Sequence, residues 1–161
     1  NKKRFLEWCE HVAIALPQVT AIDVIEREED HHAYFKLTYN DRYVVSSSGL
    51  SDGTLRILAL TLLSYIPNPP ALLMIEEPEN GIHPRAIAAV LDALGSIRKC
   101  QVFVSSHSPV VVANTKLENL YAARLARDGA ATVIRGDNHP RMKEWKGEID
   151  LGTLYATGVF Q

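Results

Sequence analysis

The sequence contains no lysine directly after a glycine, so the Gly-Lys-Ser/Thr of a phosphate-binding loop is absent. A nucleotide cannot be cradled by that type of loop within these 161 residues. Cysteine is also scarce, because Cys9 and Cys100 are the only two and are separated by most of the chain. This spacing fits neither a metal site nor a redox pair and favours a reduced, cytoplasmic setting.

An excess of charge of one sign is missing as well. Lys and Arg number 17 against 19 Asp and Glu, which gives a net charge of −2, so the composition carries no basic footprint that would indicate nucleic-acid binding. Apolar runs such as 71–75 are far shorter than the roughly 20 residues of a membrane span, and no secretory leader opens the chain, so no membrane association is expected. The length suits one compact domain, and Asn1 in place of Met predicts a fragment or a processed chain.

The pattern over residues 1–45 predicts a helix and a small antiparallel sheet. Apolar residues recur at helical spacing over 4–16, and Pro17 ends that pattern. Residues 19–26 and 33–39 are typical of strands, and a turn then leads into a third strand at 43–45.

The central part of the chain predicts a βαβ unit. Residues 55–66 form a helical segment that is apolar nearly all round, which indicates burial. The run 71–75 is typical of a strand covered on both faces. Pro84 can start the next helix, and 102–104 is a second short buried strand, so the two strands are expected to lie parallel.

The C-terminal part carries weaker signals. Asp128-Gly129 is a hairpin turn signal between the segments 120–125 and 131–134. A last short helix is expected after Glu148. The chain as a whole therefore predicts an α/β fold of mostly parallel buried strands flanked by helices, with small antiparallel hairpins.

Polar side chains gather where the two predicted parallel strands end. Glu76 and Glu77 follow one strand, and Ser105, Ser106 and His107 follow the other. Parallel strands place these ends at one edge of the sheet, where open α/β folds bind ligands. Two carboxylates and an imidazole are therefore expected to converge on one crevice.

Other interpretations of the acidic segment remain open at this point. Glu79 and His83 lie just before Pro84 and are able to cap the following helix. Together with Glu76 and Glu77 they also suit a metal cluster, although their spacing matches no specific ligand pattern.

Ser51, Asp52 and Gly53 precede the predicted central helix. The simplest interpretation is an N-cap, in which Ser51 or Asp52 accepts hydrogen bonds from the first free backbone N–H groups. A helix N-terminus also attracts a phosphate, and a glycine lets the phosphate approach the backbone closely.

Taken in order, four motifs resemble those of a known family. Residues 50–54 (Leu-Ser-Asp-Gly-Thr) resemble the ABC signature, and 72–77 (Leu-Leu-Met-Ile-Glu-Glu) a Walker B strand with its catalytic glutamate. Residues 78–84 (Pro-Glu-Asn-Gly-Ile-His-Pro) resemble the D-loop, and 105–109 (Ser-Ser-His-Ser-Pro) the switch-histidine loop. This series is similar to the C-terminal lobe of RecF/SMC/OLD-like ABC-class ATPases, prokaryotic "AAA family" members among them.

The resemblance implies ATP as substrate, Mg²⁺ as cofactor and a role for each residue. Glu77 would orient and deprotonate the water that attacks the γ-phosphate. Glu76 would hold Mg²⁺, through water, and His107 would contact the γ-phosphate as a sensor.

The remaining motif residues would act on the nucleotide of an opposite subunit. Ser51, Asp52 and Gly53 would form the signature that clamps this γ-phosphate, chiefly through the Ser51 side chain and the Gly53 backbone. Asn80 would bridge across the dimer. Two positions depart from the common pattern: Asp52 stands where many ABC proteins carry Gly, and Glu76 where most carry Asp.

The expected parent protein is an ATPase that dimerises head to head. On this view residues 1–161 form one partial ATPase domain whose Walker A lobe lies elsewhere, so the isolated fragment is expected to be inactive. The expected partners are a second copy or the N-terminal Walker A lobe, with DNA or an effector nuclease left open. The resemblance implies a DNA-related or defence process, such as antiviral defence. The alternatives are a non-hydrolysing dimerisation or docking module and a metal-dependent nuclease.

Overall fold

The computed structural model describes residues 2–126, 128–143, 145 and 147–160. Its contacts divide the chain into two units, Asn1–Ser105 and Ser106–Gln161, and each is described by itself. Across the described residues, no helix is both long enough and apolar enough to cross a bilayer.

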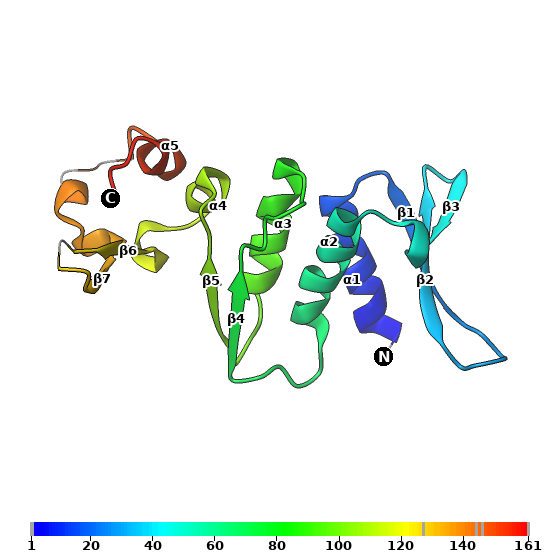
Figure 1. The fold of residues 1–161 in the computed structure, drawn as a ribbon. Helices are drawn as coiled ribbons and strands as arrows, with labels where there is room; N and C mark the ends of the chain where they lie inside the picture. Colours follow the sequence, from blue (N-terminus) through cyan, green and yellow to red (C-terminus); the bar gives the residue numbers. More distant parts are fainter. Residues whose placement is uncertain (1, 127, 144, 146, 161) are drawn as a thin grey trace. The chain divides into compact units, whose positions relative to one another are not determined.

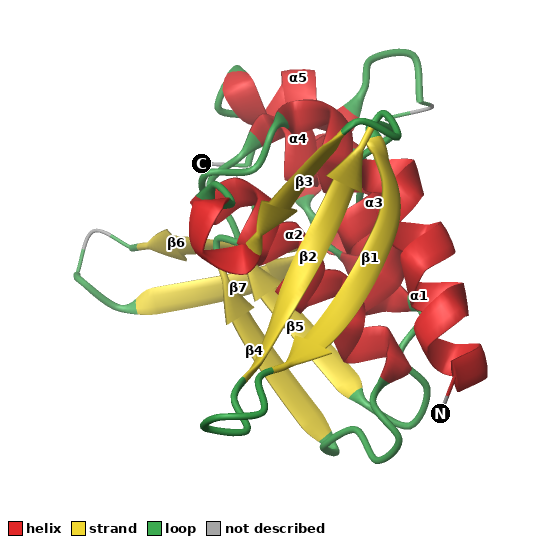
Figure 2. Cartoon of the chain, turned by 90° about the vertical axis from the view of Figure 1, so that its right-hand side faces the viewer, coloured by secondary structure: helices red, strands yellow, loops and turns green. Residues whose placement is uncertain are grey.

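The first unit opens with a helix that packs on a three-stranded antiparallel sheet. Its elements are α1 (Lys2–Ala15), β1 (Val19–Glu26), β2 (Ala33–Tyr39) and β3 (Tyr43–Ser46). The strands pair in the order β1-β2-β3, and Figure 2 shows this sheet in front of the helices. Leu37, at the middle of the central strand, is fully buried. The helix and antiparallel sheet predicted for residues 1–45 are thereby confirmed.

Trp8 links α1 to both of its neighbours. Its ring is 1% exposed and lies 5.7 Å from the ring of Phe35 on β2, measured between centroids. Its indole N–H donates to the Thr61 hydroxyl over 3.0 Å, and that hydroxyl donates in turn to the carbonyl of Ile57 over 2.7 Å. The buried indole N–H therefore depends on one polar side chain of the neighbouring helix.

Replacing Thr61 by Val keeps the shape of the side chain and leaves the Trp8 N–H buried without an acceptor. A buried donor that loses its partner costs about 1–3 kcal/mol, so we expect the free energy of unfolding to fall by that amount. Denaturant unfolding monitored by Trp fluorescence measures it. Thr38→Val on β2 is the matched control, because Val is favoured in strands; an equal loss in both variants would contradict the assignment.

A βαβ unit completes the first unit. Its elements, with the preceding helix, are α2 (Asp52–Leu62), β4 (Leu72–Glu76), α3 (Pro84–Gly95) and β5 (Gln101–Ser105), and a 3-10 turn over Leu63–Tyr65 extends α2. The strands β4 and β5 pair in parallel, with Glu76 opposite Ser105, as the sequence predicts. Figure 1 shows the three helices between this parallel pair and the antiparallel sheet.

Burial in the βαβ region is lower than the sequence predicts. The helix α2 buries Ile57 and Leu58 but leaves Leu62 37% exposed, so it is not buried all round. On β4 the exposed fractions of Leu72 and Met74 are 50% and 76%. The expectation of a strand covered on both faces is therefore wrong for these residues, since the helices of the unit cover only one face of the pair.

The second unit consists of two short helices and a hairpin. They are α4 (Pro109–Ala113), β6 (Tyr121–Leu125), β7 (Ala131–Arg135) and α5 (Leu151–Ala156). The antiparallel hairpin and the final helix are as predicted. A small core holds the unit together; its buried members are Val112, Met142, Leu151 and Phe160. The α/β class, with a parallel pair and antiparallel hairpins, is confirmed.

Candidate functional site

Two carboxylates stand at the carboxyl end of the parallel pair. Glu76 is the exposed last residue of β4, and Glu77 follows it with its side chain half-buried. The backbone N–H of Glu77 donates to the carbonyl of Ser105 over 2.8 Å, which continues the ladder one step beyond the strands. The predicted placement of both glutamates at this sheet edge, beside the end of β5, is therefore confirmed.

Glu77 adopts an unusual backbone conformation. Its φ is +44°, in the left-handed region that side-chain-bearing residues seldom occupy. Such conformations cost on the order of 1–3 kcal/mol, persist only where the surroundings hold them and cluster at functional sites. The hydrogen bond to Ser105 and a second one, from the Asn80 N–H to the Glu77 carbonyl over 3.0 Å, hold Glu77 in place.

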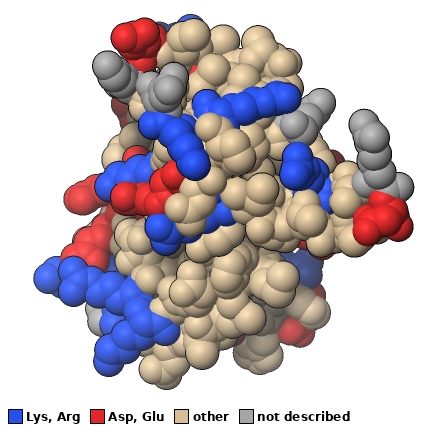
Figure 3. Space-filling view, turned by 90° about the vertical axis from the view of Figure 1, so that its left-hand side faces the viewer, with Lys and Arg blue, Asp and Glu red and all other residues tan. Residues whose placement is uncertain are grey.

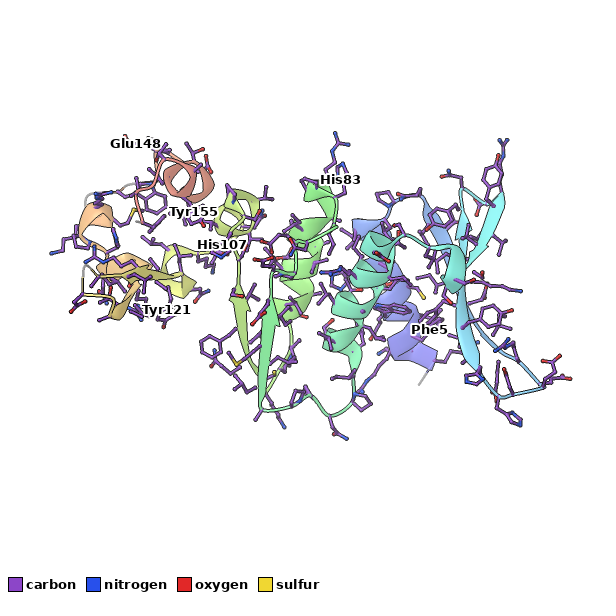
Figure 4. All side chains as sticks on the ribbon, in the orientation of Figure 1. Phe5, His83, His107, Tyr121, Glu148 and Tyr155 are labelled. Carbon is purple, nitrogen blue, oxygen red and sulfur yellow. The ribbon has the colours of Figure 1, made fainter. Side chains whose placement is uncertain are left out.

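The same loop begins α3 through His83. Its Nδ1 accepts from the backbone N–H of Arg85 over 3.2 Å, so His83 is the cap that the sequence allows, and Figure 4 shows it at the start of the helix. No three His, Cys, Asp or Glu side chains among the described residues are grouped to hold a metal ion. A metal cluster on Glu76, Glu77, Glu79 and His83 is therefore not supported.

The signature-like residues lie at the start of α2. Ser51 is the N-cap, and its hydroxyl oxygen accepts from the Thr54 N–H over 3.2 Å. Asp52 is the exposed first residue of the helix. A Cβ at Gly53 would collide with the carbonyl oxygen of Gly81, so the start of α2 touches the loop after β4.

Two features of this loop were not predicted from the sequence. The first is that the Asn80 side-chain amide donates to the carboxylate of Glu77 in the same chain. The second is that Gly81, whose φ is +73°, lies against Gly53. Asn-Gly is a strong turn signal, so the turn was accessible to sequence reasoning. The contacts of Asn80 with Glu77 and of Gly81 with Gly53 were not accessible in this way, because they depend on how the loop packs.

His107 belongs to the second unit, in the segment that joins β5 to α4 (Figure 4). Its side chain is exposed. Its neighbours shape the segment: the Ser106 hydroxyl accepts from the Ser108 N–H over 3.0 Å, and the Ser108 hydroxyl caps α4 by accepting from Val110 N–H over 3.2 Å. The predicted role of His107 as a phosphate sensor stays a prediction.

Comparison with known proteins identifies the family. A family model described as "AAA domain, putative AbiEii toxin, Type IV TA system" matches residues 12–113, more than half of the chain. The chain belongs to this AAA-domain family. The match runs from α1 through α4 and contains every candidate site residue named above.

Solved structures show which fold this AAA-domain protein shares. One, from work on "ATP-driven dimerization and DNA stimulated activation of SMC ATPases", is 17% identical with a TM-score of 0.66, and the alignment covers 87% of each chain. Another, "the SmcHead bound to the C-winged helix domain of ScpA", is 19% identical with a TM-score of 0.64. There the alignment covers 81% of this chain and 41% of the SMC chain, so this chain spans less than half of that one.

The resemblance predicted from the motifs is thereby confirmed at this level: the chain belongs to the AAA-domain family and shares the fold of SMC ATPase heads. No curated protein matches the AAA-domain chain. The roles of the individual residues are not tested by these likenesses and stay predictions.

Proposed function

We propose that the protein to which this lobe belongs hydrolyses ATP at a site that two subunits share. The observation that carries the proposal is the loop after β4, where Glu77 is held in a strained conformation at the carboxyl edge of a parallel pair. The start of α2, with its signature-like residues, touches that loop through Gly53 and Gly81. The AAA-domain family and the SMC-head fold support ATP as the substrate.

The side chains divide the chemistry of phosphoryl transfer, which needs chiefly positioning and charge stabilisation. The Glu77 carboxylate would accept a proton from the attacking water. His107 would contact the γ-phosphate. Ser51 and the Gly53 backbone would contact the phosphate held by the opposite subunit, where the free N–H groups at the start of α2 favour negative charge.

The residues present also fit a magnesium ion that arrives with ATP. Mg²⁺ is typically bound by one or two carboxylates, several waters and the substrate phosphates, and it does not need a dedicated cage of protein ligands. Glu76 is exposed at the end of β4 and offers such a carboxylate. The ion would neutralise charge on the phosphate oxygens.

The uncovered face of the parallel pair supports a second lobe as partner. Parallel sheets are almost always covered on both faces, yet Leu72, Met74 and Phe103 expose large apolar surfaces here. We propose that a lobe carrying the phosphate-binding loop, from elsewhere in the same protein, packs on this face. ATP would then lie between that lobe and the signature of a second copy.

The energy of hydrolysis would serve a DNA-related or defence process. The family description, which names a putative toxin of a type IV TA system, favours defence. On the face drawn in Figure 3, acidic and basic side chains both occur, and some of them lie next to one another. We therefore do not assign DNA contact to this face.

Phosphate release from ATP by the full-length protein tests the proposal. We expect turnover in the presence of Mg²⁺ and its loss when EDTA removes the ion, because the phosphate charge would no longer be neutralised. The rate per molecule should also rise with protein concentration, since two copies complete the site. ATP binding without phosphate release under any of these conditions would favour the dimerisation or docking module instead.

A further inference from the structure

The loop between β4 and α3 is built from two overlapping turns. The first spans Glu77 to Asn80, where the Asn80 N–H donates to the Glu77 carbonyl over 3.0 Å and the buried Pro78 follows Glu77. The second spans residues 79–82, where the Ile82 N–H donates to the Glu79 carbonyl over 3.0 Å. Proline suits the second position of a turn, and a glycine with positive φ, here Gly81, suits the third. The sequence of the loop thus fits its conformation.

These turns bring the side chain of Asn80 back onto Glu77. The amide nitrogen Nδ2 of Asn80 lies in hydrogen-bond contact with the carboxylate oxygen Oε2 of Glu77. An ionised carboxylate only accepts, so the amide must be the donor, and this fixes which way round the Asn80 amide lies. The contact is made within one chain, whereas the family resemblance predicts that Asn80 bridges two subunits.

We infer that Asn80 is a positioning residue, which holds the Glu77 carboxylate of its own subunit in the orientation needed to accept a proton from water. The inference rests on the proposed function, in which Glu77 is the general base. A free glutamate side chain samples many rotamers, and a general base must lie within hydrogen-bond reach of the proton that it takes. A neutral amide orients the carboxylate without competing for that proton.

The rest of the loop keeps Asn80 itself in place. Gly81 follows Asn80 directly, and its carbonyl lies against Gly53 at the start of α2. The backbone of Glu77 is tied at its other end to Ser105 on β5. Asn80 is therefore held between two elements of the first unit, as a positioning residue requires.

Asn80→Asp is the sharpest test, because it keeps the shape of the side chain but exchanges the donor for a second carboxylate. Asp and Asn serve equally well in turns, so a purely structural role predicts little change. A positioning role predicts that kcat of the full-length protein for ATP falls about tenfold or more while KM changes little, since a hydrogen bond to a charged group is lost. Asn80→Ala, which removes the donor without adding charge, should lower kcat in the same direction.

Asn68→Asp is the matched control, since Asn68 is exposed and lies before the opposite end of β4. The double variant Asn80→Asp, Glu77→Gln gives a second readout. If Asn80 acts through Glu77, the double variant should be no slower than Glu77→Gln alone.

Three results would overturn the inference. The first is an unchanged kcat in a folded Asn80→Asp protein, and the second is a further loss of rate in the double variant. The third is weaker ATP-dependent dimerisation when Asn80→Asp is added to Glu77→Gln, which would assign Asn80 to the subunit interface. A wild-type rate for Glu77→Gln alone would instead refute the proposed function.

Discussion

Replacing Glu77 by Gln should lower steady-state phosphate release by the full-length protein about 10²–10⁴-fold, the usual cost of losing a general base. Gln has nearly the same size and still offers an oxygen to the Asn80 amide, so the two-turn loop should persist. What it lacks is the ability to accept a proton from the attacking water. The loss should therefore appear in kcat, with ATP affinity retained.

A second measurement separates lost chemistry from lost structure. The Glu77→Gln protein should accumulate as an ATP-bound dimer, observed by light scattering with ATP and Mg²⁺, because nucleotide that is not hydrolysed keeps the shared site closed. Glu28→Gln is a matched control in the exposed turn between β1 and β2, and its rate should equal that of the wild type. A wild-type rate in Glu77→Gln would contradict Glu77 as the base.

The sequence predicted most elements of the first unit because its patterns are unambiguous. The limits of β1 and β2 agree with the structure to the residue. The helix α2 begins at Asp52, three residues before the start at Leu55 predicted from apolar spacing, because Ser51 caps a first turn that has no apolar residue. The helix α4 was not predicted: three of its five residues are valines, which favour strands, and the Ser108 cap with Pro109 decides otherwise.

The prediction that both faces of β4 are buried is wrong for a physical reason. The apolar run 71–75 predicts a strand covered on both faces, yet Leu72 and Met74 on one face are exposed. Met74 is apolar although 76% of it is exposed, which is what a strand face that another lobe covers would carry. The mismatch therefore supports a further lobe, placed as proposed above on the open face of the parallel pair.

For the site, strand order alone placed the two glutamates at one sheet edge. The contact between Asn80 and Glu77 was beyond sequence reasoning, because it depends on the positive φ of Glu77, which no residue preference predicts. The contact of Gly53 with Gly81 joins segments 28 residues apart and arises only from packing. Sequence patterns therefore predict which residues belong to the candidate site, whereas the contacts between them become known only from the tertiary structure.

Replacing Ser51 by Asp should strongly lower phosphate release while leaving the fold intact. Ser51 caps α2, and Asp caps helices equally well, so the free energy of unfolding should stay within a few tenths of a kcal/mol of the wild type. The added charge would face the γ-phosphate of the opposite subunit. Like charges brought together in an interface cost several kcal/mol, which corresponds to a loss on the order of 100-fold or more. Ser51→Asn, an uncharged cap of the same size, should lose far less.

Mixing the two inactive proteins distinguishes a shared site from one that lies within a single chain. A heterodimer of Ser51→Asp with Glu77→Gln contains two different sites. One site takes its base, Glu77, from the Ser51→Asp subunit and its signature, Ser51, from the Glu77→Gln subunit. Both of these residues are unchanged, so this site is wild type. The other site carries both substitutions. An equal mixture in which subunits exchange freely should therefore recover about a quarter of the wild-type rate, because half of the dimers have one working site. Heterodimers that form, as seen with two different affinity tags, but release no more phosphate than the parent variants would contradict a site built from Glu77 of one subunit and Ser51 of the other.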